Sequence, residues 1–260
     1  MTGVAERRRG LLSAFTSSRG PPRLVRDAAI YVVRCGMIDA ALFDWDGTLL
    51  DSRETLLGAW HAATESVLGK RFPATAEEEE LVFTLPGSQL FPHVAGDADL
   101  APRLAAAFHE AYEAKGDLVR PFAGVVELLG RLRAARLRIA VVTSKARRRY
   151  DLDAAHIGVD GLVDVAVCQE DTRAHKPDAA PVLYALRALG VLPEAAVLVG
   201  DTPVDVAAGT AAGTRVVGAA WGAAGERALL DAGPSTVVRD ARELAEIVLG
   251  ADTKTERSAT

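Results

Sequence analysis

Short apolar runs recur along this chain, and the segments between them repeat at helical spacing. We predict strands at residues 40–43, 138–142, 163–167, 196–199, 214–217 and 236–238. Between the later strands we expect helices at residues 125–135, 178–189, 204–212 and 241–249. Continuous apolar strands that alternate with helices are typical of a parallel sheet buried on both sides. The sequence therefore predicts an α/β fold, a Rossmann-like parallel sheet with helices on both faces.

A long segment without a convincing strand separates the first apolar run from the second. In this segment apolar residues repeat at helical spacing, at positions 56, 60, 63 and 67 and again at positions 104, 108 and 111. Each stripe predicts an amphipathic helix. We therefore expect a small all-helical domain of residues 52–118, inserted after the first strand into a core formed by residues 37–51 and 119–250.

Both ends of the chain differ from this pattern. Residues 1–36 contain seven arginines but only two acidic residues. An Arg- and Ser-rich leader can be an organelle transit peptide. Because Met37 stands immediately before the first strand, we favour a basic, disordered extension or an overlong start. Residues 251–260 are polar and are expected to fray.

Composition excludes several classes of protein. In a chain of 260 residues, 49% hydrophobic residues are enough for a proper core. The net charge of -5 disfavours binding to nucleic acid and to anionic membranes, and no apolar run is long enough to cross a bilayer. The two cysteines, Cys35 and Cys168, form no metal-binding or disulfide pattern. We expect a soluble, cytoplasmic monomer or homodimer without nucleic-acid or membrane partners.

Two carboxylates follow the first predicted strand. Asp44 and Asp46 stand two positions apart, just where ligands collect in α/β sheets, beyond the carboxyl ends of the strands. Gly47 permits a sharp turn, and Thr48 and Ser52 offer hydroxyl groups to that turn. The segment predicts a site that handles phosphate, although an acidic turn after a strand is an alternative.

Three later strands are also followed by polar residues of the kinds that bind phosphate or metal ions. In a parallel sheet these residues would gather on the edge that holds the two carboxylates. Taken singly, they could be a threonine that caps a helix, a solvated lysine and an aspartate N-cap. Together they form a candidate site made of Thr143, Ser144, Lys176, Asp201 and Asp205.

With these residues in place, the sequence resembles the haloacid dehalogenase-like superfamily. Four motifs recur in order, at residues 44–48, 141–144, 175–177 and 200–205, and the resemblance extends from about residue 37 to residue 249. It implies that the helical domain is the smaller type of cap found in that superfamily. Phosphoglycolate phosphatases and related bacterial pyrophosphatases look most like this chain, notably over residues 141–147.

The resemblance implies a phosphatase that uses Mg²⁺ and forms an aspartyl-phosphate. A carboxylate that attacks a phosphate dianion at about 4 Å is repelled by about 8 kcal/mol at an effective dielectric constant near 20, so the site must supply positive charge. Asp44 would be the nucleophile and Asp46 the proton carrier, with other carboxylates expected around it. The implied phosphate-binding residues are Thr143, Ser144 and Lys176. The implied metal ligands are Asp44, Asp201, Asp205 and, through its carbonyl oxygen, Asp46.

Differences between this chain and the motifs of related families narrow the range of possible reactions. Phosphonoacetaldehyde hydrolases carry alanine at the position of Asp46, and dehalogenases also lack this second aspartate, so the resemblance favours cleavage of a P–O bond. Leu56 stands where sugar phosphomutases of the same cap type use a histidine, which disfavours mutase activity.

The sequence is compatible with several candidate substrates. We expect a small phosphorylated metabolite, a phosphoglycolate-like monoester, with inorganic pyrophosphate and sugar or nucleotide monophosphates as alternatives. A small acidic substrate would require a cation from the helical domain, for which the candidates are Arg53, Lys70, Arg71, Arg103 and Lys115. Alternatives from another class are a phospho-receiver domain and a non-catalytic binding protein.

Overall fold

The computed structural model describes residues 38–85, 87–115 and 118–250. The predictions for residues 1–36 and 251–260, and Cys35, lie outside these described residues. The described part of the chain is built around one large sheet.

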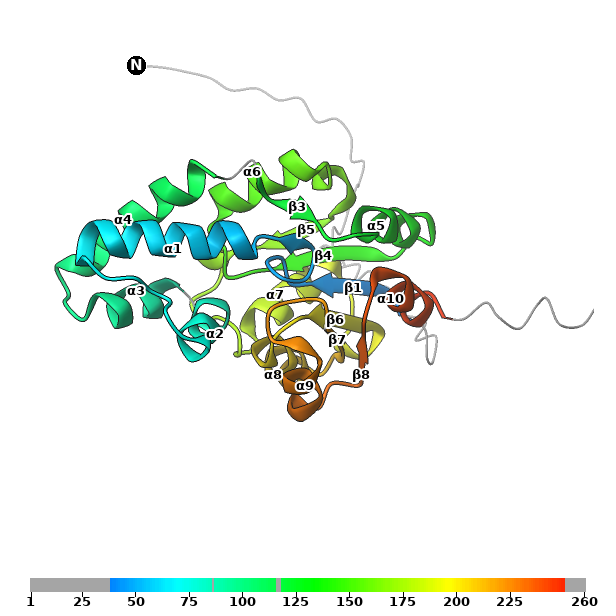
Figure 1. Cartoon of the computed structure of the whole chain (residues 1–260). Coiled ribbons are helices and arrows are strands. Elements are labelled where there is room, and N and C mark those ends of the chain that lie inside the picture. Colours follow the sequence, from blue (N-terminus) through cyan, green and yellow to red (C-terminus); the bar gives the residue numbers. More distant parts are fainter. Residues whose placement is uncertain (1–37, 86, 116–117, 251–260) are drawn as a thin grey trace, which may run out of the picture. The chain divides into compact units, whose positions relative to one another are not determined.

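Six parallel strands form this sheet, in the order β5-β4-β1-β6-β7-β8 (Figure 1). Their bounds are β1 Ala40–Phe43, β4 Arg138–Val142, β5 Val165–Val167, β6 Ala196–Gly200, β7 Arg215–Ala219 and β8 Thr236–Val238. Successive side chains of a strand point to opposite faces of the sheet, so a strand without polar residues supplies a core on both sides. All four residues of β1 are fully buried, as expected for the centre of such a sheet.

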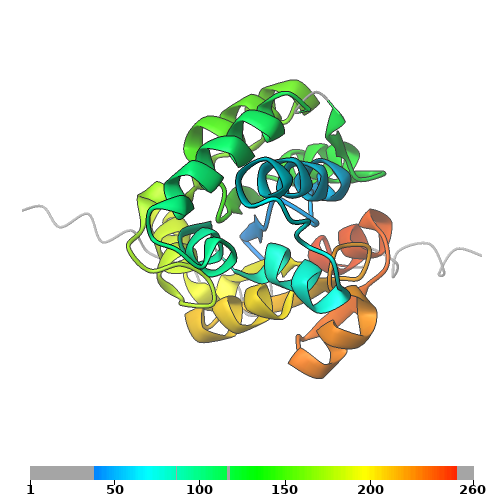
Figure 2. The same cartoon turned by 60° about the vertical axis from the view of Figure 1, so that its left-hand side comes forward.

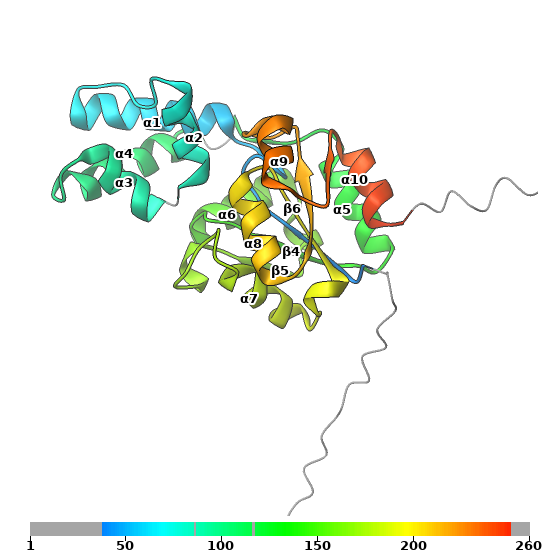
Figure 3. The same cartoon turned by 90° about the horizontal axis from the view of Figure 1, so that it is seen from below.

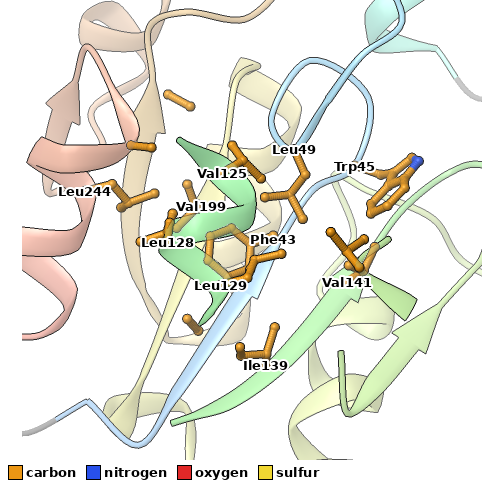
Figure 4. Close-up of a cluster of buried hydrophobic side chains, with 14 of the residues drawn as sticks. Phe43, Trp45, Leu49, Val125, Leu128, Leu129, Ile139, Val141, Val199 and Leu244 are labelled. Carbon is orange, nitrogen blue, oxygen red and sulfur yellow. The ribbon is translucent and has the colours of Figure 1, made fainter. Parts of the chain in front are cut away.

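Helices cover both faces of the sheet (Figure 3). Phe43 and Ala41 pack into one core with α5 and α10 (Figure 4), whereas Ala40 and Leu42 pack into the opposite core with α7 and α8. The bounds of the core helices are α5 Val125–Ala134, α6 Arg147–Ile157, α7 Ala180–Leu189, α8 Pro203–Ala212, α9 Gly225–Ala232 and α10 Ala241–Val248. The predicted parallel α/β fold with helices on both faces is confirmed.

Two elements begin two residues later than predicted, for local reasons. Strand β5 begins at Val165 instead of residue 163, because the Asp164 carboxylate accepts the N–H of Ile139 at 2.8 Å. Helix α7 begins at Ala180 instead of residue 178, because the Asp178 carboxylate accepts the Ala180 N–H at 2.7 Å. Side chains that satisfy backbone groups in this way compete with regular structure.

The segment after β1 is helical, as predicted, and it begins and ends in a short ladder. Strands β2 Leu50–Asp51 and β3 Arg120–Pro121 pair antiparallel and join the insertion to the rest of the chain. The sequence did not predict them, because two residues are too few to show a period of two. Between them lie α1 Arg53–Leu68, α2 Ala76–Thr84, α3 Gly87–Ala95 and α4 Leu100–Glu113.

The inserted helices share a core of their own. Helices α1 and α4 lie side by side (Figure 2), and their facing stripes bury Trp60 and Phe108, whose rings are 5.0 Å apart. Thr75 begins α2 by accepting the N–H of Glu78, and Gly69 ends α1 in the left-handed conformation that favours glycine. The longest of these helices, α1, has 16 residues. No helix in the described ranges is long and apolar enough to cross a membrane.

Candidate functional site

The candidate site lies at the carboxyl end of β1. Phe43 is in register with Val141 of β4 on one side and with Val199 of β6 on the other, so the residues that follow these strands meet there. The Asp44 N–H continues the ladder by donating to the Val199 carbonyl at 2.9 Å. From β1 the chain continues to β4 and β5 on one side of β1, and it then crosses to β6, β7 and β8 on the other side. The point where the direction of the strand order changes is where α/β proteins bind ligands.

Three carboxylates meet at this point. Asp44, Asp201 and Asp205 each offer an oxygen within 4.8 Å of the others. Burial raises the pKa of Asp44 well above its ordinary value, with further contributions from Asp205 and Asp201. Burial, together with Asp205, also raises the pKa of Asp201 to about 7. Crowded, desolvated carboxylates of this kind favour a bound cation.

Lys176 supplies one positive charge to this cluster. Its ammonium group donates to Asp44 Oδ1 and to Asp205 Oδ1, both at 2.7 Å, and its side chain is 6% exposed. Burial alone would lower the pKa of Lys176, but Asp205 and Asp44 raise it above its ordinary value. The ammonium therefore stays charged and holds Asp44 and Asp205 in place.

Backbone and hydroxyl donors fix Asp201. Its carboxylate accepts the Thr48 hydroxyl at 2.9 Å and the N–H of Ala223 at 2.7 Å. Gly47 lies against this carboxylate at a φ of +84°, and a Cβ there would collide with it. A Cβ at Gly222 would collide with the same side chain. The close approach of the chain to Asp201 thus requires glycine at both positions.

Asp46 has a different environment from the one expected. We expected other carboxylates around it, but its Oδ1 lies 2.8 Å from the Lys145 ammonium group and accepts the Ser52 hydroxyl at 2.6 Å. Lys145 also contacts Asp153 at 2.7 Å and donates to the Tyr112 hydroxyl at 3.0 Å. Asp46 is therefore held by a cation and a hydroxyl group.

Sequence reasoning missed the roles of Lys145 and Tyr112. Burial alone would lower the pKa of Lys145, but Asp46, Tyr112 and Asp153 raise it, and burial raises the pKa of Tyr112 to about 12. Both groups therefore keep their protons at neutral pH. The only sequence feature that could have placed Lys145 in the site is its position directly after Thr143 and Ser144. No sequence feature could have placed Tyr112 there, because it lies on helix α4, far along the chain.

A cavity of about 610 Å³ opens over these residues. Asp44, Asp46, Thr143, Ser144 and Lys176 all line it, together with side chains of the inserted helices. The Thr143 hydroxyl accepts the N–H of Lys145 at 3.1 Å, which orients it beside the strand end. Asp205 also lines the cavity, while Asp201 is fully buried behind it. The cavity thus brings the predicted phosphate-binding residues and the acidic cluster to one place.

Comparisons with known proteins agree with this arrangement. Residues 41–219 match the family model of haloacid dehalogenase-like hydrolases. The pyrophosphatase PpaX of Bacillus pumilus is 31% identical over 216 residues, which cover 83% of this chain and 98% of the relative. PpaX of Bacillus velezensis is 30% identical over 212 residues, covering 81% of this chain and 96% of the relative.

Solved structures show the same fold. A predicted phosphoglycolate phosphatase from Haemophilus somnus superposes with a TM-score of 0.73 at 25% identity, covering 81% of this chain and 97% of that one. A predicted phosphatase from Clostridium acetobutylicum has a TM-score of 0.73 at 22% identity, covering 82% of this chain and 99% of that one.

The fold and the site define a hydrolase of the α/β class. The chain belongs to the haloacid dehalogenase-like hydrolase family, as its four motifs indicated. The prediction of a phosphatase-type enzyme is confirmed at the level of this family.

Proposed function

We propose that this protein is a Mg²⁺-dependent phosphatase that hydrolyses a small phosphomonoester through an aspartyl-phosphate at Asp44. One observation carries the proposal. The Asp44 carboxylate lies at the switch point of the sheet, where the acidic cluster, Lys176 and the cavity meet. A carboxylate nucleophile can approach a phosphate group only if the negative charge of the phosphate is neutralised. The acidic cluster could bind a cation for this purpose, and the Lys176 ammonium group lies next to Asp44.

The donor set fits Mg²⁺. Asp44 and Asp201 offer hard carboxylate oxygens, which are the protein ligands that this ion prefers, and they lie close enough to share it. Their raised pKa values show that Lys176 alone does not offset the buried negative charge. Asp44, Asp201 and the carbonyl group of Asp46 would hold the ion, with Asp205 orienting Lys176 or a bound water. When bound, Mg²⁺ would supply positive charge next to the phosphoryl oxygens.

Two displacements at phosphorus complete the proposed reaction. In the first, an Asp44 oxygen forms a bond to phosphorus, the P–O bond to the leaving group breaks, and the leaving oxygen takes a proton from Asp46. In the second, a water molecule gives a proton to Asp46 and attacks the same phosphorus atom, which frees inorganic phosphate and restores the Asp44 carboxylate. Thr143, Ser144 and Lys176 would bind the phosphoryl oxygens throughout.

The contacts of Asp46 support its part as proton carrier. The Ser52 hydroxyl and the Lys145 ammonium group both contact Oδ1. Oδ2 has no hydrogen-bond partner among the described residues, and we assign it to the leaving group and to water. Fixing one oxygen limits the rotation of the carboxyl group and keeps the other aimed at the reacting atoms.

We assign residues 37–51 and 119–250 to a catalytic core and residues 52–118 to a helical cap. The separate hydrophobic cluster of α1, α3 and α4 supports this division. A cap over the cavity would exclude water and select the leaving group. We also propose that the protein is cytoplasmic and is a monomer or a homodimer.

Inorganic pyrophosphate is a second candidate substrate, because the 31% identical relative from Bacillus pumilus is named a pyrophosphatase. The same two displacements would serve it, with phosphate instead of an alcohol as the leaving group. Initial rates with pyrophosphate, phosphoglycolate, and sugar and nucleotide monophosphates, measured side by side, separate these candidates.

Chelation of metal should abolish the proposed activity. We expect saturable release of nitrophenol from p-nitrophenyl phosphate with Mg²⁺, loss of this activity in EDTA, and recovery when Mg²⁺ is added in excess, because the phosphate and Asp44 repel each other without the ion. Full activity in EDTA would contradict the metal assignment. Absence of turnover with Mg²⁺ would favour a receiver or binding protein instead.

Stabilisation by Mg²⁺ should depend on pH. The folded pKa of Asp201, about 7, exceeds its ordinary value of 3.8, so folding takes up a proton in this range and the metal-free protein loses that contribution to stability as pH rises through 7. Mg²⁺ must displace this proton. At one excess concentration of Mg²⁺, we expect its increment to the free energy of unfolding to be about 2 kcal/mol smaller at pH 5.5 than at pH 8.

Chemical denaturation with and without Mg²⁺ measures this increment, and the Asp201→Asn variant provides the control because it has no carboxyl group to titrate at that position. Equal stabilisation at both pH values would mean that Asp201 does not bind the ion.

A further inference from the structure

The cavity over Asp44 is much larger than a phosphate group needs. Its volume of about 610 Å³ lies within the range of about 300–1,000 Å³ that encloses drug-sized organic ligands. Asp44, Thr143, Ser144 and Lys176 occupy only its core side. The remaining space lies against the inserted helices, so those helices meet whatever is attached to the phosphate.

The wall on that side is largely apolar and in part aromatic, and its polar members are Thr84, Ser88, His109, Tyr112 and Glu113. Leu56 of α1, Val82 and Phe83 of α2, and Phe91 of α3 line the cavity, and each is only partly buried by the protein itself. Trp60 also lines the cavity, and its ring stacks on that of Phe91 at 4.9 Å. Partly exposed apolar groups that face a cavity gain stability when an apolar ligand covers them.

The lysines and arginines that line the cavity are already paired. Lys176 contacts Asp44 and Asp205, and Lys145 contacts Asp46 and Asp153. The two arginines contact carboxylates as well, in the pairs Arg148 with Glu113 and Arg149 with Asp153. A second anionic group on the substrate therefore finds no uncommitted lysine or arginine among the described lining residues.

The basic residues that the sequence offered for this purpose lie elsewhere. None of the five candidates of the helical domain is among the described residues that line the cavity. Arg53, for example, is bonded to Glu79, and Arg71 is bonded to Glu65. The described part of the helical domain therefore places no lysine or arginine in this cavity for a small acidic substrate.

We propose that the enzyme selects phosphate monoesters whose leaving group is an apolar alcohol of about the size of an aromatic ring, and discriminates against substrates that carry a second anionic group. This proposal rests on the proposed phosphatase function and adds the chemical class of the substrate. In the reaction, the P–O bond to the apolar alcohol breaks, the alcohol leaves with a proton, and water supplies the fourth oxygen of the phosphate.

Three phosphate monoesters with alkoxide leaving groups test the proposal in the full-length protein with Mg²⁺. Benzyl phosphate carries a ring, ethyl phosphate carries none, and 2-phosphoglycolate carries a carboxylate. We expect kcat/KM for benzyl phosphate to exceed the other two by on the order of 10- to 100-fold, because the ring covers the apolar wall. Inorganic pyrophosphate, measured in parallel, should also be a poorer substrate.

The outcomes separate the two proposals. Equal or higher kcat/KM for ethyl phosphate, phosphoglycolate or pyrophosphate would overturn the substrate class and leave the phosphatase function standing. Release of phosphate from none of these compounds would overturn the phosphatase function itself, and the substrate class with it.

A charge placed on the apolar wall gives a second test. Leu56→Lys should lower kcat/KM for benzyl phosphate and raise it for phosphoglycolate, shifting their ratio by about tenfold or more. Leu57→Lys is the matched control, because Leu57 lies on the same helix, is partly buried like Leu56 and does not line the cavity. An equal ratio in the Leu56→Lys variant and the unmodified protein would contradict the proposal. Thermal denaturation establishes that both variants are folded.

Discussion

Replacing Asp44 by asparagine should lower kcat by at least about 10⁴-fold, because the amide cannot form the phosphoryl bond on which both displacements depend. The fold should survive. Burial and two neighbouring carboxylates already raise the pKa of Asp44, so a neutral group of the same shape suits the position. Steady-state rates with p-nitrophenyl phosphate and Mg²⁺ measure the loss, and circular dichroism establishes the folded state.

Asp51→Asn is the matched control for this variant. Asp51 lies on β2, a short distance along the chain from Asp44, and its side chain is exposed. We expect its activity to equal that of the unmodified protein. Activity of the Asp44→Asn variant within about tenfold of that value would exclude Asp44 as the nucleophile.

Replacing Lys176 by methionine should lower the free energy of unfolding by about 3–5 kcal/mol at pH 8 in EDTA. The ammonium group is buried between Asp44 and Asp205, and its loss leaves their negative charge without a partner. The effect should shrink as pH falls toward 5. Without the ammonium the folded pKa of Asp44 rises further above its unfolded value, so the folded variant takes up a proton and regains stability.

Urea denaturation at both pH values measures this difference, and Lys70→Met provides a control at an exposed lysine after α1. A destabilisation of the same size at pH 5 and pH 8 would indicate lost packing instead of unpaired charge. Added Mg²⁺ should restore part of the stability of the Lys176→Met variant at pH 8.

The sheet could be predicted from the sequence because its strands are apolar on both faces. The bounds of β4 and β8 match the prediction, and β6 extends it by one residue, Gly200. Strand β7, at Arg215–Ala219, begins one residue and ends two residues later than predicted. The late start of β5 occurs where a side chain takes a backbone partner, as Asp164 does. Residue patterns record burial along one segment, and they do not record a hydrogen bond between two segments.

The candidate site was predictable to the extent that its residues come after the ends of strands. Asp44, Thr143, Asp201 and Lys176 could be placed because parallel strands end at one edge. The donors that hold Asp201 include the N–H of Ala223, and a backbone group leaves no signal in a sequence. The bond between Tyr112 and Lys145 joins helix α4 to the loop that follows β4, so its formation depends on tertiary structure alone.

The wall of the cavity was the least predictable part. The stripes in α1 and α4 predicted which apolar residues of these helices pack together, and Trp60 and Phe108 are buried as expected. The same patterns do not separate a residue that packs against a helix from one that lines a cavity, as Leu56 and Phe91 do. The same apolar side chains are suited to packing against a helix and to lining a cavity, because both remove apolar surface from water.

The aspartyl-phosphate at Asp44 can be tested directly by mass spectrometry of the Asp46→Asn variant, quenched in acid during turnover with Mg²⁺ and p-nitrophenyl phosphate, whose nitrophenolate leaves without a proton from Asp46. Without the Asp46 carboxylate, the water that should hydrolyse the intermediate is not activated, so the intermediate should accumulate. We predict a gain of one phosphoryl group on the peptide that contains Asp44, removed by hydroxylamine and absent when Asp44 is also replaced by asparagine. A phosphoryl group on another residue, or turnover without any phosphorylated protein, would contradict the mechanism.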